Sequence, residues 1–244
     1  MLDMKNFLVL AATLWITLFA THSAQAQGEQ DSAKVQFYCA SWDPMSDQLY
    51  FRSSKKKDEE SYTPVDLSVM LRSQLYEVKA SGTIPFFKKG KLSPEGEQLY
   101  DQVAVAKIPP GVRRVTLIFL KSKEGNLGIR TIPDDRKQSP FGGYQFFNMT
   151  NLTVYGTLGG KRFKIAPGKH ATVKLSKSPG EALPYATFAE INGEKQWLER
   201  NTLTFNPKKH LKVFMLAEAD KRGRVRIHTK GLAEFEPAPG QEGS

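Results

Sequence analysis

The chain has 244 residues, of which 40% are hydrophobic, 25% charged and 11% aromatic, and its formal net charge is +10. This composition is typical of a globular protein and excludes disordered, collagen-like and disulfide-scaffold classes. The charge is uneven, since residues 27–140 hold 18 Lys and Arg against 15 Asp and Glu, whereas residues 141–235 hold 16 against 7. The second half of the chain is therefore the basic half.

Residues 1–26 are expected to form a cleaved signal peptide. Lys5 precedes the apolar run 6–20, and residues 23–26 (Ser-Ala-Gln-Ala) supply the small side chains that suit cleavage. An uncleaved anchor is the competing interpretation, but about 15 apolar residues fall short of the ~20 that a spanning helix needs. We therefore expect export to the periplasm or the exterior, and no membrane span in the mature chain.

The chain has one cysteine, Cys39, so no internal disulfide can form. Val35, Phe37 and Cys39 alternate with other residues, which places the thiol on the apolar face of a strand. We expect a buried, inert thiol; an intermolecular bridge or a reactive thiol is the alternative.

Past residue 27 the apolar pattern has a period of two, which predicts strands. A strand is expected over 65–72, where Val65, Leu67, Val69 and Leu71 alternate with other residues. The continuous apolar segments 115–120 and 213–217 predict central strands covered on both faces. Asn192-Gly193 predicts a hairpin turn. The one helical candidate is a turn or two from Ser93 toward Tyr100.

Many short strands with frequent turns predict an all-β protein of two tandem immunoglobulin-like antiparallel β-sandwiches. A Pro-, Gly- and charge-rich segment marks the boundary between them. A weak echo between 108–117 and 165–175, each with a Pro-Gly turn before a strand, also suggests two related units. The expected layout is a signal peptide (1–26), an N-terminal sandwich (27–132), a linker (133–143), a basic C-terminal sandwich (144–235) and a disordered tail (236–244).

The segment from Tyr144 to Gly168, with its run Gly159-Gly160-Lys161-Arg162-Phe163-Lys164-Ile165, resembles uncharacterised exported bacterial proteins with immunoglobulin-like β-sandwich domains. The resemblance covers about residues 141–175. It implies a fold and an exported location, and it brings no catalytic residue with it.

Cations of the second half follow a period of two, which predicts a basic strand face. They are Arg222, Arg224, Arg226, His228 and Lys230 on one segment, with Arg162, Lys164 and Lys174 alternating outward nearby. Like charges side by side raise the energy of a fold unless solvent, salt or an anionic partner screens them. The functional hypothesis is an anion-binding face; the alternative is a solvated face that protects a sheet edge.

Aromatic side chains offer a second binding hypothesis. Trp42 and Trp197 could stack against sugar rings on the surface of a sandwich, although large rings also fill sandwich cores. A carbohydrate-binding module is therefore the alternative function.

Nothing in the sequence predicts catalysis, a cofactor or a metal site. The histidines and the one cysteine are not at ligand spacing, and no nucleophile elbow or phosphate loop is present. The acidic pairs Asp134-Asp135 and Glu190 with Glu194 are expected to be solvated surface charge rather than glycosidase carboxylates.

The resulting expectation is a non-enzymatic cell-envelope protein whose basic second half engages an anionic envelope polymer or a protein partner. Nucleic acid is not expected as a partner in an exported compartment. A module that pairs through a free strand edge would leave no mark in the sequence.

Overall fold

The computed structural model describes residues 33–53, 61–80, 82–122, 124–191, 193–219 and 225–236. The expected signal peptide (1–26) and all but the first residue of the expected tail (236–244) lie outside this part. The described residues form strands and no helix. The all-β prediction is confirmed.

The first eight strands form one unit made of two sheets. They are β1 (Ala33–Ser41), β2 (Leu49–Arg52), β3 (Tyr62–Val65), β4 (Tyr76–Ala80), β5 (Thr83–Leu92), β6 (Gln98–Lys107), β7 (Arg114–Lys121) and β8 (Leu127–Pro133). The sheet orders are β4-β1-β7-β8 and β3-β2-β5-β6. The two sheets pack face to face around a core that includes Phe37, Phe86 and Leu117.

The last eight strands form the second unit. They are β9 (Gly143–Asn148), β10 (Val154–Leu158), β11 (Lys161–Ile165), β12 (His170–Lys174), β13 (Ala182–Ile191), β14 (Glu194–Thr204), β15 (Lys209–Ala219) and β16 (Val225–Phe235). The sheet orders are β12-β9-β15-β16 and β11-β10-β13-β14. Phe146, Val154 and Met215 lie in the core between them.

The two units share one topology. Each strand of the second unit occupies the place of the strand eight earlier in the first, in both sheets. The echo between 108–117 and 165–175 does not follow this repeat, because the first segment leads into β7 and the second into β12, the counterpart of β4. The units are therefore related by topology, at positions other than those that the Pro-Gly turns suggested.

The expectation of wholly antiparallel sheets was wrong for one strand pair in each unit. β1 runs parallel to β7, and β9 runs parallel to β15. In each unit the first strand lies between the fourth and the seventh, and five strands separate it from the seventh along the chain. This long connection leaves room for a parallel pairing that a short hairpin could not make.

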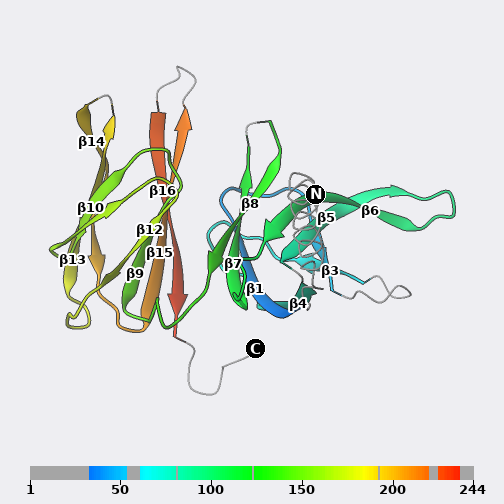
Figure 1. The fold of residues 1–244 in the computed structure, drawn as a ribbon, viewed down its shortest axis with the longest axis horizontal. Coiled ribbons are helices and arrows are strands. Elements are labelled where there is room, and N and C mark those ends of the chain that lie inside the picture. The colour runs from blue at the N-terminus through cyan, green and yellow to red at the C-terminus, as the bar shows by residue number, and fades with distance from the viewer. Residues whose placement is uncertain are drawn as a thin grey trace, which may run out of the picture.

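The two units lie side by side along the long axis of the molecule, with β9, β15 and β16 next to β1, β7 and β8 in the middle and with β5 and β6 running outward along that axis (Figure 1). We call β4-β1-β7-β8 and β12-β9-β15-β16 the inner sheets, because they face each other, and the remaining two the outer sheets. A third apolar cluster lies between the inner sheets, where Ile118 and Ile132 of the first unit pack with Phe147, Phe214 and Leu232 of the second. β7 and β15 are consequently covered on both faces, as their continuous apolar runs predicted.

A cluster of ion pairs lies beside this apolar contact. Lys212 of β15 is fully buried and donates to Glu234 of β16 at 2.7 Å and to Asp134 at 3.2 Å. Arg72 of the first unit lies 2.6 Å from Asp134 and 3.1 Å from Glu234. Arg136 contacts Glu234 at 2.6 Å. The cluster therefore joins both units and the segment between them.

The pKa values of the two acids follow from these contacts. Burial alone would raise the pKa of Asp134 and of Glu234, but the attraction of Lys212 and Arg72 outweighs burial and lowers both. Burial and the charge of Lys212 lower the pKa of His210, which favours the neutral form of its ring. The expectation that Asp134 is solvated surface charge was wrong, because the segment after β8 is enclosed between the units.

Two local predictions were wrong for geometric reasons. β3 ends at Val65, and the chain then bends at Met70, which has a φ of 50°; Met70 is buried, whereas Leu71 is 65% exposed. No helix follows Ser93, whose hydroxyl accepts bonds from the amides of Glu95 and Glu97 in the turn between β5 and β6. A serine that could cap a helix suits a tight turn as well, because its hydroxyl can accept bonds from nearby backbone amides in either structure.

Two other predictions are confirmed. Cys39 lies in β1 with its side chain buried in the core of the first unit, and burial raises the pKa of its thiol. β13 and β14 form the expected hairpin, in which Ile191 pairs with Glu194, and Gly193 has a φ of 80°, which favours glycine; Asn192 lies outside the described residues.

Candidate ligand-binding face

A row of aromatic side chains crosses the outer sheet of the second unit on its solvent side. Tyr155 of β10 pairs with Phe188 of β13, and Phe188 pairs with Trp197 of β14. The Tyr155 and Phe188 rings are stacked with centroids 5.1 Å apart, and Trp197 meets Phe188 edge to face at 5.5 Å. Their neighbours Val154 and Leu158 point the other way, into the core. The row is therefore the outward half of an alternating pattern.

A β-bulge aligns Trp197 with Arg200. Thr187 pairs with Glu199, whereas Phe188 pairs with Trp197, so Leu198 is an extra residue in β14. The bulge lets residues three apart share a face, which strict alternation forbids. As a result the Arg200 guanidinium lies 3.7 Å from the centre of the Trp197 ring.

Further cations surround the row. The Lys195 ammonium lies 4.0 Å from the ring centres of both Phe188 and Trp197. Lys164 of β11 pairs with Tyr155 and places its ammonium 5.4 Å from that ring. The negative face of an aromatic ring attracts a cation and holds it nearby, also at sites that are exposed to solvent. We call Tyr155, Phe188 and Trp197 together with Arg162, Lys164, Lys195 and Arg200 the Trp197 face.

The Trp197 face is hollowed rather than flat. A hollow of about 370 Å³ is lined by Tyr155, Phe188, Trp197 and Lys195, with Arg162 of the next cross-strand row. Trp197 is 44% exposed, which is unusual for so large a ring. Glu190, opposite Lys195 in the ladder, adds one negative charge at the turn end of the face.

Gly156 leaves space for an aromatic ring beneath the hollow. Gly156 of β10 pairs with Phe163 of β11, and a Cβ at Gly156 would lie 2.2 Å from the Phe163 ring. Phe163 is stacked on the buried Phe146 at 4.5 Å. The absence of a side chain at Gly156 therefore lets the β11 ring fold under the sheet against the core.

The structure separates the residues predicted to bind sugars. Trp197 belongs to the exposed face just described. Trp42 is 2% exposed and lies in the apolar cluster between the inner sheets, with the Lys230 ammonium 4.7 Å from its ring centre. No ring face of Trp42 is open to a ligand, so its predicted stacking role is incompatible with its burial.

The cations of residues 222–230, which were predicted to form a basic strand face and are called here the basic ladder, end at the contact between the two units. Arg222 and Arg224 lie outside the described residues. Arg226, His228 and Lys230 do share one face of β16, with Ile227 turned into the core as predicted. That face continues to the buried Leu232 and Glu234, and Lys230 donates to the Trp42 carbonyl and to Asp43 at 3.0 Å. The end of the ladder thus serves the contact between the two units.

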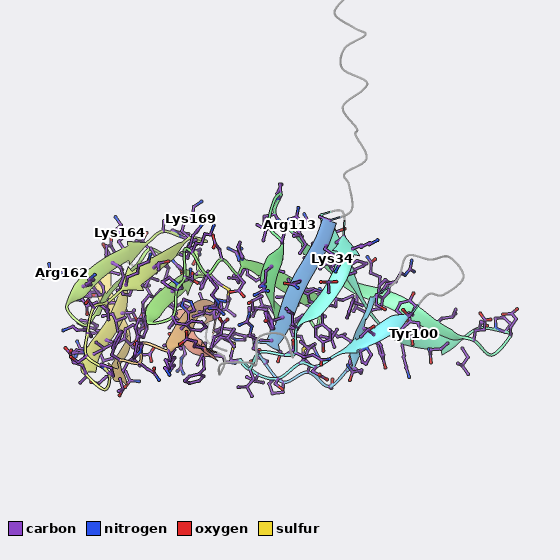
Figure 2. The ribbon with its side chains drawn as sticks, turned by 90° about the horizontal axis from the view of Figure 1, so that it is seen from below. Lys34, Tyr100, Arg113, Arg162, Lys164 and Lys169 are labelled. Carbon is purple, nitrogen blue, oxygen red and sulfur yellow. The ribbon has the colours of Figure 1, made fainter. Side chains whose placement is uncertain are left out.

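The remaining predicted cations lie on two different sheets. Arg162 and Lys164 are on β11 of the outer sheet, at one end of the molecule (Figure 2). Lys174 is exposed on β12 of the inner sheet, and its carbonyl accepts a bond of 2.5 Å from Lys161. Arg162 and Lys164 therefore contribute to the Trp197 face, and Lys174 does not.

A second hollow, of about 480 Å³, lies between the units. Its lining mixes both charges, since it includes Arg113 and Arg114 as well as Asp134 and Asp135. Asp134 already has its cationic partners, and Arg114 donates to Gln36 at 2.8 Å. This lining selects neither an anion nor a cation. In the described part of the chain, no three His, Cys, Asp or Glu side chains gather as metal ligands would.

Sequence reasoning missed Tyr155, Phe188, Lys195 and Arg200. The alternation of Val154, Gly156 and Leu158 with Tyr155 and Thr157 could have placed Tyr155 outward. Phe188 carries no such signal, because both faces of β13 are rich in apolar residues. The bulge at Leu198 could not be foreseen from a pattern, and it alone brings Arg200 to the face.

No protein-family model matches the chain, and no curated protein matches it. Within the described ranges, no helix has the length and hydrophobicity needed to cross a bilayer.

Proposed function

We propose that this protein is a non-enzymatic binding protein that holds an acidic polysaccharide on its Trp197 face. The observation that carries the proposal is the cross-strand row of Tyr155, Phe188 and Trp197 with Lys195 and Arg200 directly over its rings. This arrangement unites the two chemistries that the sequence suggested separately, a cationic surface and an aromatic platform.

An acidic sugar polymer matches the face in both respects. The C–H faces of pyranose rings pack on flat aromatic side chains, and their carboxylates or phosphates pair with Lys and Arg. A neutral glycan would leave the cations unused, and a polyanion without rings would leave the aromatic row unused. A row that crosses three strands, with Lys164 on a fourth, also suits an extended polymer, because sugars could lie one after another along it.

The wider setting is part of the same proposal. Each unit has two sheets packed face to face around one core, which supports an immunoglobulin-like sandwich for each. The apolar run 6–20 and the small residues after it support export to the periplasm or the exterior, where envelope polysaccharides occur. Binding without catalysis is supported by the lack of a nucleophile motif in the sequence.

The test is retention on immobilised polygalacturonate, a linear polymer of uronate sugars. Retention of the protein is expected at about 0.05 M salt and is expected to fall near 0.5 M, where screening shortens to about 4–5 Å. Immobilised dextran, which is neutral, and soluble polyphosphate, which lacks rings, are the comparisons. Dextran should retain little protein, and polyphosphate should compete poorly with polygalacturonate.

Variants locate the site. Trp197→Ala and Arg200→Gln should each weaken retention by roughly five- to tenfold. The matched control is Phe235→Ala, because Phe235 is also an exposed ring with a lysine near it, Lys209 at 6.0 Å, but lies on β16. Equal losses from Trp197→Ala and Phe235→Ala would refute the site. Salt-resistant retention on dextran would favour the neutral carbohydrate-binding module, and no retention on either glycan would favour a protein partner.

A further inference from the structure

The outer sheet of the first unit also carries aromatic side chains on its solvent side. The Tyr62 and Tyr100 rings are stacked at 3.7 Å, Tyr50 meets Tyr100 edge to face at 5.3 Å, and Tyr62 meets Phe87 at 5.2 Å. The three tyrosines are half-buried, with their inward neighbours Leu49 and Phe51 in the core.

Cations accompany these rings too. The Arg52 guanidinium lies 5.7 Å from the ring centre of Tyr62 and 5.9 Å from that of Phe87. The Lys89 ammonium lies 5.8 Å from the ring centre of Tyr50. Tyrosine hydroxyls add hydrogen-bonding groups that suit the hydroxyls of sugars. We call Tyr50, Tyr62, Phe87 and Tyr100 with Arg52 and Lys89 the Tyr100 face.

The two faces occupy equivalent places in the repeated topology. Tyr50 of β2 pairs with Phe87 of β5, as Tyr155 of β10 pairs with Phe188 of β13. These are corresponding strands in the two outer sheets.

The bulge is repeated as well. Phe86 pairs with Ala104 and Phe87 with Gln102, so β6 has an extra residue at Val103, as its counterpart β14 has at Leu198. Bulges reposition side chains at functional sites. In both units the bulge lies beside the phenylalanine that points away from the core of the unit; Phe188 is half-buried and Phe87, which the tyrosines cover, is 8% exposed.

The two faces lie toward opposite ends of the molecule. The outer sheets are at the two ends of the long axis in Figure 1, and Figure 2 shows Arg162 and Lys164 at one end of the molecule with Tyr100 toward the other. The buried ion pairs and the apolar cluster between the inner sheets hold the ends apart. One ligand segment therefore cannot contact both faces at once without wrapping around the molecule.

We propose that the Tyr100 face is a second binding site for an acidic polysaccharide, so that one protein molecule links two polymer chains. This inference rests on the proposed function, because it takes the ligand class from the Trp197 face. It adds a second binding site, formed by the residues of the Tyr100 face, and a cross-linking activity that a protein with one site could not have.

The test separates binding from cross-linking. Soluble polygalacturonate mixed with the wild-type protein should scatter light, with a maximum at intermediate protein and a decline in excess protein as each chain becomes coated. Short oligogalacturonates, too small to bridge, should titrate with about two binding sites per protein molecule. Circular dichroism and the unfolding midpoint of every variant monitor its fold.

A variant at either face should reduce the number of oligogalacturonate sites per protein molecule from about two to about one. Tyr100→Ala and, to keep the rings intact, Lys89→Gln alter the Tyr100 face; Trp197→Ala with Arg200→Gln alters the Trp197 face. Each altered face should leave about one site for the short oligomer, abolish scattering, and lower the apparent affinity for immobilised polymer at least ~10-fold through lost avidity. Phe235→Ala should retain both sites and the scattering.

Each contrary result has a distinct meaning. If the Trp197-face variant loses all binding while the wild type binds one oligomer, the Tyr100 face is not a site and the proposed function stands. If Tyr100→Ala and Lys89→Gln, both folded, still cross-link, the second site is likewise refuted. If the wild type binds no polygalacturonate at all, the proposed function fails and this inference fails with it.

Discussion

The Lys212 ammonium and the Asp134 carboxylate lie 3.2 Å apart with neither side chain exposed, although 78 residues separate them in the chain. Lys212 belongs to β15 of the second unit, and Asp134 follows the last strand of the first. Such a pair is costly to bury alone, and here Glu234, Arg72 and Arg136 complete it. The contact between the units thus depends on a polar cluster as well as on apolar packing.

Replacement of Lys212 tests this cluster. Lys212→Ala would leave the Asp134 and Glu234 oxygens that it now contacts buried without that donor, and should lower the free energy of unfolding by about 2–5 kcal/mol. The measurement is urea denaturation followed by tryptophan fluorescence. Lys177→Ala, which breaks the exposed pair between Lys177 and Glu181, is the control and should have a much smaller effect. Equal effects would show that the buried cluster adds nothing.

The pH dependence of stability follows from the same acids. The pKa values of Asp134 and Glu234 are lowered in the folded state, so below about pH 4 the unfolded chain binds more protons than the folded one. Their contribution is present above that range and is lost as the pH falls through the folded pKa values. Urea midpoints should therefore decline between about pH 5 and pH 3. In the Asp134→Asn/Glu234→Gln variant this decline should be shallower; an unchanged slope would assign it to other carboxyls.

Gly156 offers a steric test of the support beneath the Trp197 face. In Gly156→Ala the new Cβ would lie 2.2 Å from the Phe163 ring, so the ring must move and the free energy of unfolding should fall by about 1–3 kcal/mol. Gly128→Ala in β8 is the matched control, since its nearest atom would be 3.8 Å away. The two variants should differ clearly in thermal midpoint; similar midpoints would mean that Phe163 moves aside freely.

The Cys39 thiol should be unreactive toward thiol reagents in the folded protein. Its thiol is enclosed in the core of the first unit, and burial raises the pKa so that little thiolate is present near pH 8. Ellman's reagent should react slowly in buffer and quickly in concentrated urea. Fast reaction of the folded protein would mean that β1 opens readily and would return the thiol to consideration as a reactive group.

Sequence patterns predicted the strands well because alternation reports which residues share a face. They did not predict what covers each face. Trp42 was an alternative candidate for stacking on the surface, yet the second unit covers it; the acidic partners of Lys212 come from residues 22 and 78 positions away. Contacts between separate units leave no periodic signal in either segment.

The Trp197 face was partly predictable for a related reason. Arg162, Lys164 and Trp197 were chosen on charge and ring size, and the structure brings these three together. The other residues of the face could be placed only with the register of four strands and the bulge at Leu198. Both depend on pairing between segments far apart in the chain. The equivalent position of the Tyr100 face in the first unit could be recognised only from the topology of the whole chain.

The apolar contact between the inner sheets bears on how the protein can be dissected. Ile118 on one side and Phe214 and Leu232 on the other would meet water if the chain were divided near residue 138, at about 1.5–3 kcal/mol for each fully exposed side chain. A fragment carrying either half would display an adhesive patch of its own and could associate with itself or with a hydrophobic matrix. Affinities measured on isolated halves would then report that artificial surface, and only the undivided polypeptide gives a clean measure of what each end recognises.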